Sequence, residues 1–334
     1  MKSPFTGTEA EITREWVSMT FRKESFRVLF HAYRCPDTGN SFEDEAFTQL
    51  NYNQLVNQYR AKYALPFPNE IVKIRIQYGL SAARLSEILG FGTNVWRLYE
   101  NGEVPNLSNG KLIQLAADPG EFKKLVARCG TIDEKHRSKI YDRIEILFDE
   151  KRQERANRDV ENYLLGSEWP NEQTGYTRPD LSKLTEMVVF FAEKMQPWKT
   201  KLNKLLFYSD FAMFKQSGFS ISGTSYRAIP MGPVPEKYHS LFEYICAKEQ
   251  ITVQSTAFPD GGIGEQFLSY PNRTFNSSIF TAAELDVLHL IADRFEKTTT
   301  QEIIDLSHRE TAWTANEKDH KLIDYKYAFE LNGV

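Results

Sequence analysis

The chain has 334 residues, a length that predicts two or three domains. Hydrophobic residues make up 41% of it, enough for real cores, and the formal net charge of −4 excludes a polycation that binds nucleic acid by charge alone. Three cysteines far apart in the sequence, Cys35, Cys129 and Cys246, favour a reducing cytoplasm over a disulfide framework. The sequence shows no signal peptide and no apolar run of bilayer-spanning length, so we expect a cytoplasmic protein without a membrane partner.

Residues 1–65 are predicted to form a small β-rich domain with the outline of a zinc ribbon. Short alternation of apolar and polar residues predicts strands over 19–28 and 29–33. Two turns have the C-x-x-C-G frame of zinc knuckles with ligands replaced, and the four ligand positions hold Ser3, Thr6, Cys35 and Thr38. One thiolate with three hydroxyl groups is not a zinc site. We therefore expect a ribbon-like fold without metal, and the alternative is two coincidental turns.

Residues 69–117 predict short helices separated by tight turns, within a domain that spans 66–130. Ser81 has the position of an N-cap for one helix, and Thr93 for the next, which ends near Glu100. Two short helices joined by a glycine-containing turn of a few residues are typical of the helix-turn-helix motif. The pattern therefore indicates a DNA-binding domain, and the alternative is an ordinary helical bundle with a polar helix end.

The second helix of this motif is predicted to enter the DNA major groove. The residues that lead it are Thr93, Asn94 and Arg97. Asn pairs with adenine and Arg with guanine through two hydrogen bonds each, so the side chains suit base reading. Val95 and Leu98 are expected to face the core. Residues 66–130 carry 8 basic and 6 acidic side chains, a net charge of +2, so we expect affinity to depend on dimerisation and groove fit as well as on phosphate contacts.

Two further parts are expected after this domain. Residues 131–177 are predicted to form a charged connecting or dimerising helix. One apolar stripe runs along it, at Ile140, Ile144, Leu147 and Phe148. Residues 178–334 are predicted to form a mainly helical domain with a small β element. The predicted fold class is therefore mainly α with small β elements.

The last domain carries no pattern of a known active site. The sequence contains no nucleophile elbow, no HExxH and no phosphate-binding glycine-rich loop. His308 near Trp313 suggests a pocket, but a packed or capping histidine is the more common role. Asp210, midway along an apolar helix, is expected to pair with Arg227 or Lys204 inside the domain rather than to catalyse. We therefore expect no enzymatic activity, no cofactor and no metal.

The run YRAIPMGPVP is a short extended segment that leads into a proline-locked turn. It carries four candidate contact residues, Tyr226, Arg227, Met231 and Pro233. Aromatic and apolar side chains on a rigid turn make efficient contacts with a protein partner. These residues either are exposed and contact a partner protein or pack in the core of the domain, and the sequence leaves both alternatives open.

Three runs in the first half, EIVKIR, LSEILGFGTNVWRLYENG and SNGKLIQL, are similar to the MqsA-type antitoxins over about residues 1–130. That family joins an N-terminal zinc domain to an Xre-like helix-turn-helix. The resemblance implies a homodimer that binds palindromic operator DNA and represses its own operon. Asn94 matches an Asn that reads DNA in the family. The family's Arg falls at Leu98, while Arg97 lies one residue earlier, and the zinc ligands are replaced.

Three runs in the second half, KLNKLLFYSDFAMFKQSGFSISG, YRAIPMGPVP and SHRETAW, resemble the Panacea or SocA-like domain over about residues 181–320. This resemblance implies a domain that neutralises a toxin by binding it. Together the two resemblances predict an antitoxin of a type II toxin–antitoxin system, with a cognate toxin and operator DNA as partners. The alternatives are a stand-alone transcriptional regulator whose last domain senses a ligand or protein, and an adaptor that delivers a bound protein to a protease.

Overall fold

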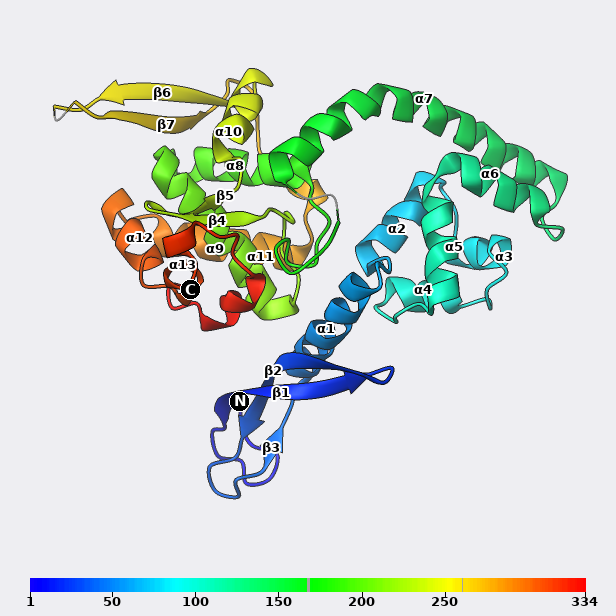
Figure 1. Ribbon diagram of the computed structural model, residues 1–334, viewed down its shortest axis with the longest axis horizontal. Coiled ribbons are helices and arrows are strands. Elements are labelled where there is room, and N and C mark those ends of the chain that lie inside the picture. Colours follow the sequence, from blue (N-terminus) through cyan, green and yellow to red (C-terminus); the bar gives the residue numbers. More distant parts are fainter. Residues whose placement is uncertain (167–168, 260) are drawn as a thin grey trace. The chain divides into compact units, whose positions relative to one another are not determined.

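The computed structural model describes residues 1–166, 169–259 and 261–334, with the backbone alone for 151–158. The chain divides into two compact units, whose elements can be followed by colour in Figure 1. Unit 1 comprises Met1–Leu55 and Glu161–Val334, and unit 2 comprises Val56–Val160. In the described residues helices dominate, and the sheets are small and antiparallel. The predicted class, mainly α with small β elements, is confirmed.

Unit 1 begins with a long β-hairpin. Its strands are β1 (Glu11–Phe21), β2 (Glu24–Arg34) and the short β3 (Ser41–Phe42), which pairs with the end of β2. Arg22 and Lys23 form the turn with φ of +47° and +70°, the left-handed backbone that a two-residue hairpin turn requires. The strand predicted over 19–28 is therefore wrong, because this turn divides it. The strand predicted over 29–33 is confirmed within β2.

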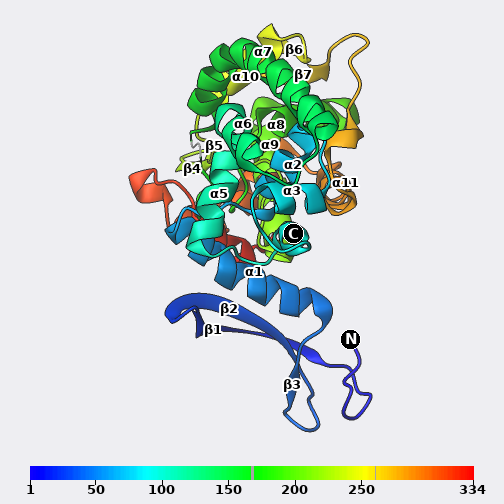
Figure 2. The same ribbon diagram turned by 90° about the vertical axis from the view of Figure 1, so that its right-hand side faces the viewer.

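Helix α1 (Glu45–Lys62) replaces a neighbouring strand along the outer edge of β2 (Figure 2). The Asn51 side chain accepts from His31 N at 2.9 Å and donates to His31 O at 2.8 Å. Gln54 makes the same pair of bonds with Leu29, at 3.0 and 2.9 Å. These buried amides satisfy backbone groups that an adjacent strand would otherwise pair, so this part of the sheet edge is closed.

Unit 2 is a set of short helices around one apolar core. The helices are α2 (Pro68–Gln77), α3 (Ala82–Ile88), α4 (Val95–Glu100), α5 (Leu107–Ala117), α6 (Pro119–Arg128) and the first part of α7 (Glu134–Leu165). Trp96 is fully buried in this core. Ile140, Ile144 and Leu147 of α7 pack into the same core. The apolar stripe of the predicted linker helix is therefore used to complete unit 2.

The capping signals of unit 2 are confirmed at one helix and wrong at the next. Ser81 Oγ accepts from Arg84 N at 3.2 Å and caps α3, as predicted. Thr93 does not cap α4. The N-cap residue of α4 is Asn94, which makes no side-chain capping bond. Asn94 therefore keeps its amide for other contacts.

The second part of unit 1 is built around α9. Its elements are α8 (Leu181–Met195), α9 (Lys199–Ser217), β4 (Tyr226–Ile229), β5 (Gly232–Pro235), α10 (Tyr238–Ala247), β6 (Ile251–Ala257), β7 (Ile263–Ser269), η1 (Ser277–Ile279), α11 (Ala282–Phe295), α12 (Thr300–Ser307), α13 (Thr311–Thr314), η2 (Glu317–Asp319) and η3 (Tyr325–Glu330). The elements that pack on α9 include α8, α11, α12, η3 and β5. Since α9 is surrounded, its polar side chains must find partners inside the protein. None of the helices in the described ranges is long and apolar enough to cross a membrane.

Candidate functional site

Asp210 is fully buried in the middle of α9 and accepts four hydrogen bonds. Oδ1 accepts from the backbone N–H groups of Ile221 and Ser222, at 2.9 and 2.8 Å. Oδ2 accepts from the Ser222 hydroxyl at 2.6 Å and the Tyr226 hydroxyl at 2.7 Å. Burial raises the pKa of Asp210, while these hydrogen bonds favour the charged form and oppose that shift. The carboxyl group therefore ties α9 to the 220–224 loop and to β4.

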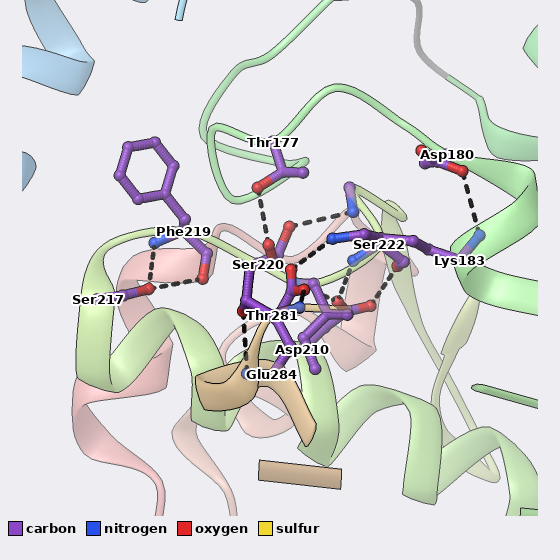
Figure 3. A network of polar contacts seen from close by, with 12 residues as sticks. Thr177, Asp180, Lys183, Asp210, Ser217, Phe219, Ser220, Ser222, Thr281 and Glu284 are labelled. Carbon is purple, nitrogen blue, oxygen red and sulfur yellow. Dashed lines mark hydrogen bonds and ion pairs between the residues drawn. The ribbon is translucent and has the colours of Figure 1, made fainter. Parts of the chain in front are cut away.

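The loop that receives Asp210 is itself held by hydroxyl groups (Figure 3). Thr177 Oγ1 donates to Ser220 O at 2.8 Å, and Ser220 Oγ donates to Thr174 O at 2.7 Å. Elsewhere in the same domain, Lys183 of α8 forms an ion pair with Glu284 of α11 at 2.6 Å. The hydrogen bonds and the ion pair drawn here join different segments of this part of unit 1, so the network holds the domain together.

Lys204 is a second fully buried polar residue of α9. Its Nζ donates to Pro233 O in β5 at 3.1 Å, and burial lowers its pKa to about 7. Gly232 lies against it with φ of +95°, and a Cβ there would come within 2.5 Å of Lys204 Cε. Glycine is therefore required for this close approach of the turn. The predicted pairing of Asp210 with Arg227 or Lys204 is wrong, because both cations bind elsewhere.

The segment from α12 to α13 joins the same centre. The buried Glu310 accepts a hydrogen bond from Tyr208 of α9 at 3.1 Å. Trp313 Nε1 donates to Ile229 O in β4 at 2.8 Å. The His308 ring stacks on Trp313 with centroids 4.0 Å apart. The packed role weighed for His308 therefore describes it better than a pocket.

Three segments far apart in the sequence thus meet: α9, the β4–β5 hairpin and the α12–α13 segment. Residues 202–314 match the family model of the antitoxin SocA-like Panacea domain. The resemblance predicted over about 181–320 is thereby confirmed for this range. No curated protein and no solved structure matches the chain. The match supports a role in toxin–antitoxin systems in general and implies a toxin as partner.

The four residues predicted to contact a toxin have different environments in the Panacea domain. Tyr226 and Pro233 are buried, so core packing describes both, and exposed anchoring does not. Arg227 is partly exposed and forms an ion pair with Glu236. Met231 is 51% exposed at the β4–β5 turn. Toxin contact stays a prediction, and the geometry leaves Met231 and Arg227 as the residues able to make it.

The residues predicted to read DNA are exposed, two of them just before α4 and the third on its outer side. They are Thr93, Asn94 and Arg97. Their side chains form no hydrogen bond or ion pair with any residue whose side chain the structure describes. The inner side of α4 is engaged: Glu100 Oε1 accepts from Arg75 Nε at 2.6 Å and Trp96 Nε1 at 2.9 Å. One side of α4 therefore serves folding, and the other is free for a ligand.

Leu98 belongs to the exposed side as well. The expectation that it faces the core is wrong, since 47% of its surface is exposed. Trp96 and Tyr99 point inward, and a residue two positions after Trp96 lies on the opposite side of a helix. Spacing alone does not decide this, because Val95 and Leu98 are three residues apart just as Trp96 and Tyr99 are; the burial of the two aromatic residues in the core places Leu98 outside. We call Thr93, Asn94, Arg97 and Leu98 the α4 face.

The four replaced knuckle positions of unit 1 lie together. Thr6 Oγ1 and Cys35 Sγ are 3.3 Å apart. Hydrogen bonds with Ser3, Thr38 and Thr6 lower the pKa of Cys35 to about 6, because they stabilise the thiolate. Cys35 itself is fully buried. Among the described residues there is no group of three or more His, Cys, Asp or Glu that could hold a metal ion.

Proposed function

We propose that this chain is the antitoxin of a bacterial type II toxin–antitoxin pair and neutralises its toxin by direct binding through the Panacea domain. The observation that carries the proposal is the family match over residues 202–314. Two buried residues of α9 support it by bonding to the β4–β5 hairpin: Asp210 accepts a hydrogen bond from Tyr226 of β4, and Lys204 donates one to Pro233 O of β5. Met231 projects from that turn, and a rigid turn with an exposed apolar side chain suits a protein partner.

The second half of the proposal assigns operator binding and autorepression to unit 2. Here α3 and α4 form a helix-turn-helix, and α4 is the recognition helix. The free polar groups of the α4 face and the similarity to MqsA-type antitoxins support this assignment. The proposed parts are a ribbon-like domain at 1–65, a DNA-binding domain at 66–130, a linker helix at 131–177 and a toxin-neutralising domain at 178–334. The protein acts as a cytoplasmic homodimer.

A stand-alone transcriptional regulator is the second candidate. The α4 face supports a stand-alone regulator as well as an autorepressing antitoxin, because both would bind DNA. In that case the Panacea domain senses a ligand or protein and neutralises nothing.

A growth experiment tests the proposal. The small gene next to this one is expressed in bacteria with and without the full chain. We expect growth arrest by the neighbour alone and rescue by the chain. A harmless neighbour favours the regulator, and arrest without rescue contradicts neutralisation.

A matched pair of variants tests the contact surface in the same assay. Met231→Asp is expected to weaken rescue, because it places a charge on the turn. Ile263→Asp is the control, since Ile263 is a 74% exposed isoleucine on β7 of the same domain. Equal rescue by both variants contradicts a role for the turn.

A further inference from the structure

The α4 face combines three kinds of side-chain chemistry on one short stretch of helix. Asn94 offers an amide, Arg97 a guanidinium group and Leu98 a branched apolar group. Asn94 precedes Arg97 by three residues and Leu98 by four, so both are its neighbours on the helix surface. Leu98 is 47% exposed, so the core does not account for it.

The other side of α4 shows that folding does not require these residues. Trp96 is fully buried and its backbone N–H donates to Ser86 Oγ at 3.1 Å. The Tyr99 hydroxyl accepts from Asn109 Nδ2 at 2.8 Å. α4 is thus anchored to α3 and α5 by its inner residues. Its outer residues can be selected for what they bind.

The chemistry of the α4 face corresponds to the base edges of a major groove. Asn pairs with the N6 and N7 edge of adenine, Arg with the O6 and N7 edge of guanine, and an apolar side chain contacts the C5-methyl group of thymine. Leucine has no donor or acceptor for a phosphate or a base edge. Its favourable contact in that groove is with a methyl group.

We propose that Leu98 is a specificity-determining residue that reads the methyl group of a thymine next to the bases contacted by Asn94 and Arg97. This inference rests on the proposed DNA-binding function and adds a base that the polar residues do not read. The modest charge of residues 66–130, a net +2, limits the affinity that phosphate contacts supply and leaves a larger share of it to base contacts.

Replacement of thymine by uracil tests the proposal, because uracil lacks only that methyl group. Short overlapping duplexes from the DNA upstream of the gene first locate the site that the full chain binds. Each thymine of that site is then replaced singly. We expect one thymine per half-site whose replacement weakens binding about three- to tenfold, and no such loss with Leu98→Ala.

Two more variants complete the cycle. Leu115→Ala is the control, since Leu115 is a 44% exposed leucine on α5, and it should keep the full thymine preference. Leu98→Arg should change the preference at that base pair from thymine to guanine, because arginine pairs with guanine.

The outcomes separate this inference from the function on which it rests. If the full chain binds none of the upstream duplexes, both the DNA-binding function and the inference are overturned. If it binds one but no thymine replacement matters, or the loss persists in Leu98→Ala, only the role of Leu98 is overturned. A change in sedimentation mass of Leu98→Ala with unaltered thymine preference would assign Leu98 to a protein interface instead.

Discussion

The α4 face of unit 2 and the Asp210 centre of unit 1 use similar residues in opposite ways. Around Asp210 a carboxylate, serines and a tyrosine are buried, and each forms hydrogen bonds to another part of the chain. On the α4 face a threonine, an asparagine and an arginine are exposed and have no partner in the described part of unit 2. The partners of a polar residue, more than its type, therefore separate a structural role from a recognition role.

The difference has a direct energetic consequence. A buried acceptor with four donors cannot be removed without leaving those donors unsatisfied, so its loss reduces folding stability. An exposed side chain without partners contributes little to folding and can be removed at the expense of binding alone. Substitutions around Asp210 should therefore lower the stability of the fold, whereas substitutions on the α4 face should weaken binding and leave stability unchanged.

The largest effect is expected for Asp210→Ala. Loss of the carboxyl group leaves two backbone N–H groups and two hydroxyl groups without their acceptor, so we expect the free energy of unfolding to fall by about 3–5 kcal/mol. Asp210→Asn keeps one acceptor oxygen and should lose less, about 1–2 kcal/mol. Urea denaturation of the full chain measures both.

The control for this comparison is Asp286→Asn on the exposed side of α11. It should change stability by less than about 0.5 kcal/mol. An Asp210→Ala variant as stable as the control would mean that the centre is not structural.

The next effect concerns binding. Asn94→Ala combined with Arg97→Ala should weaken operator binding by about 2–4 kcal/mol, because two base-reading side chains are removed. Stability should change by less than about 0.5 kcal/mol, since neither side chain has a hydrogen-bond or ion-pair partner among the side chains that the structure describes. Fluorescence anisotropy with labelled operator DNA and urea denaturation give the two quantities.

Arg128→Ala on α6 removes an exposed arginine outside the α4 face and is the matched control. It should keep nearly all of the affinity. Rescue from the toxin should survive the Asn94 and Arg97 changes, and its loss would contradict the division of labour between the two units.

The smallest of the three effects is expected at the β4–β5 turn. Gly232→Ala should cost about 1–3 kcal/mol, because the new methyl group overlaps Lys204 and Ser307 and the left-handed backbone is strained. Gly261→Ala has a similar φ of +85° with no heavy atom within 4 Å of its Cβ, so it isolates the backbone cost. If thermal unfolding shows equal losses for both, the close approach of the turn to Lys204 is unimportant.

Much of the local structure was predictable from the sequence. Ser81 caps α3 as predicted, and the Thr-x-x-Glu spacing of Thr281 and Glu284 forms a capping box at the start of α11. The helix α9 ends at Gly218, which adopts the left-handed conformation with φ of +76°. These features were accessible because a cap or a helix stop is decided by residues within one turn of each other. The hairpin turn at Arg22 and Lys23 was missed because neither residue type favours positive φ.

The helical character of the chain, the cap of α3 and the similarity of residues 202–314 to the SocA-like Panacea domain were all readable from the sequence. The hydrogen bonds of Asp210 with Ser222 and Tyr226, and the position of Leu98 outside the core, follow from tertiary packing and could not be derived from the sequence. The physical reason is distance along the chain. Helix propensity and capping act between near neighbours, whereas the partner of a buried carboxylate and the side of a helix that faces water depend on which remote segments pack against it.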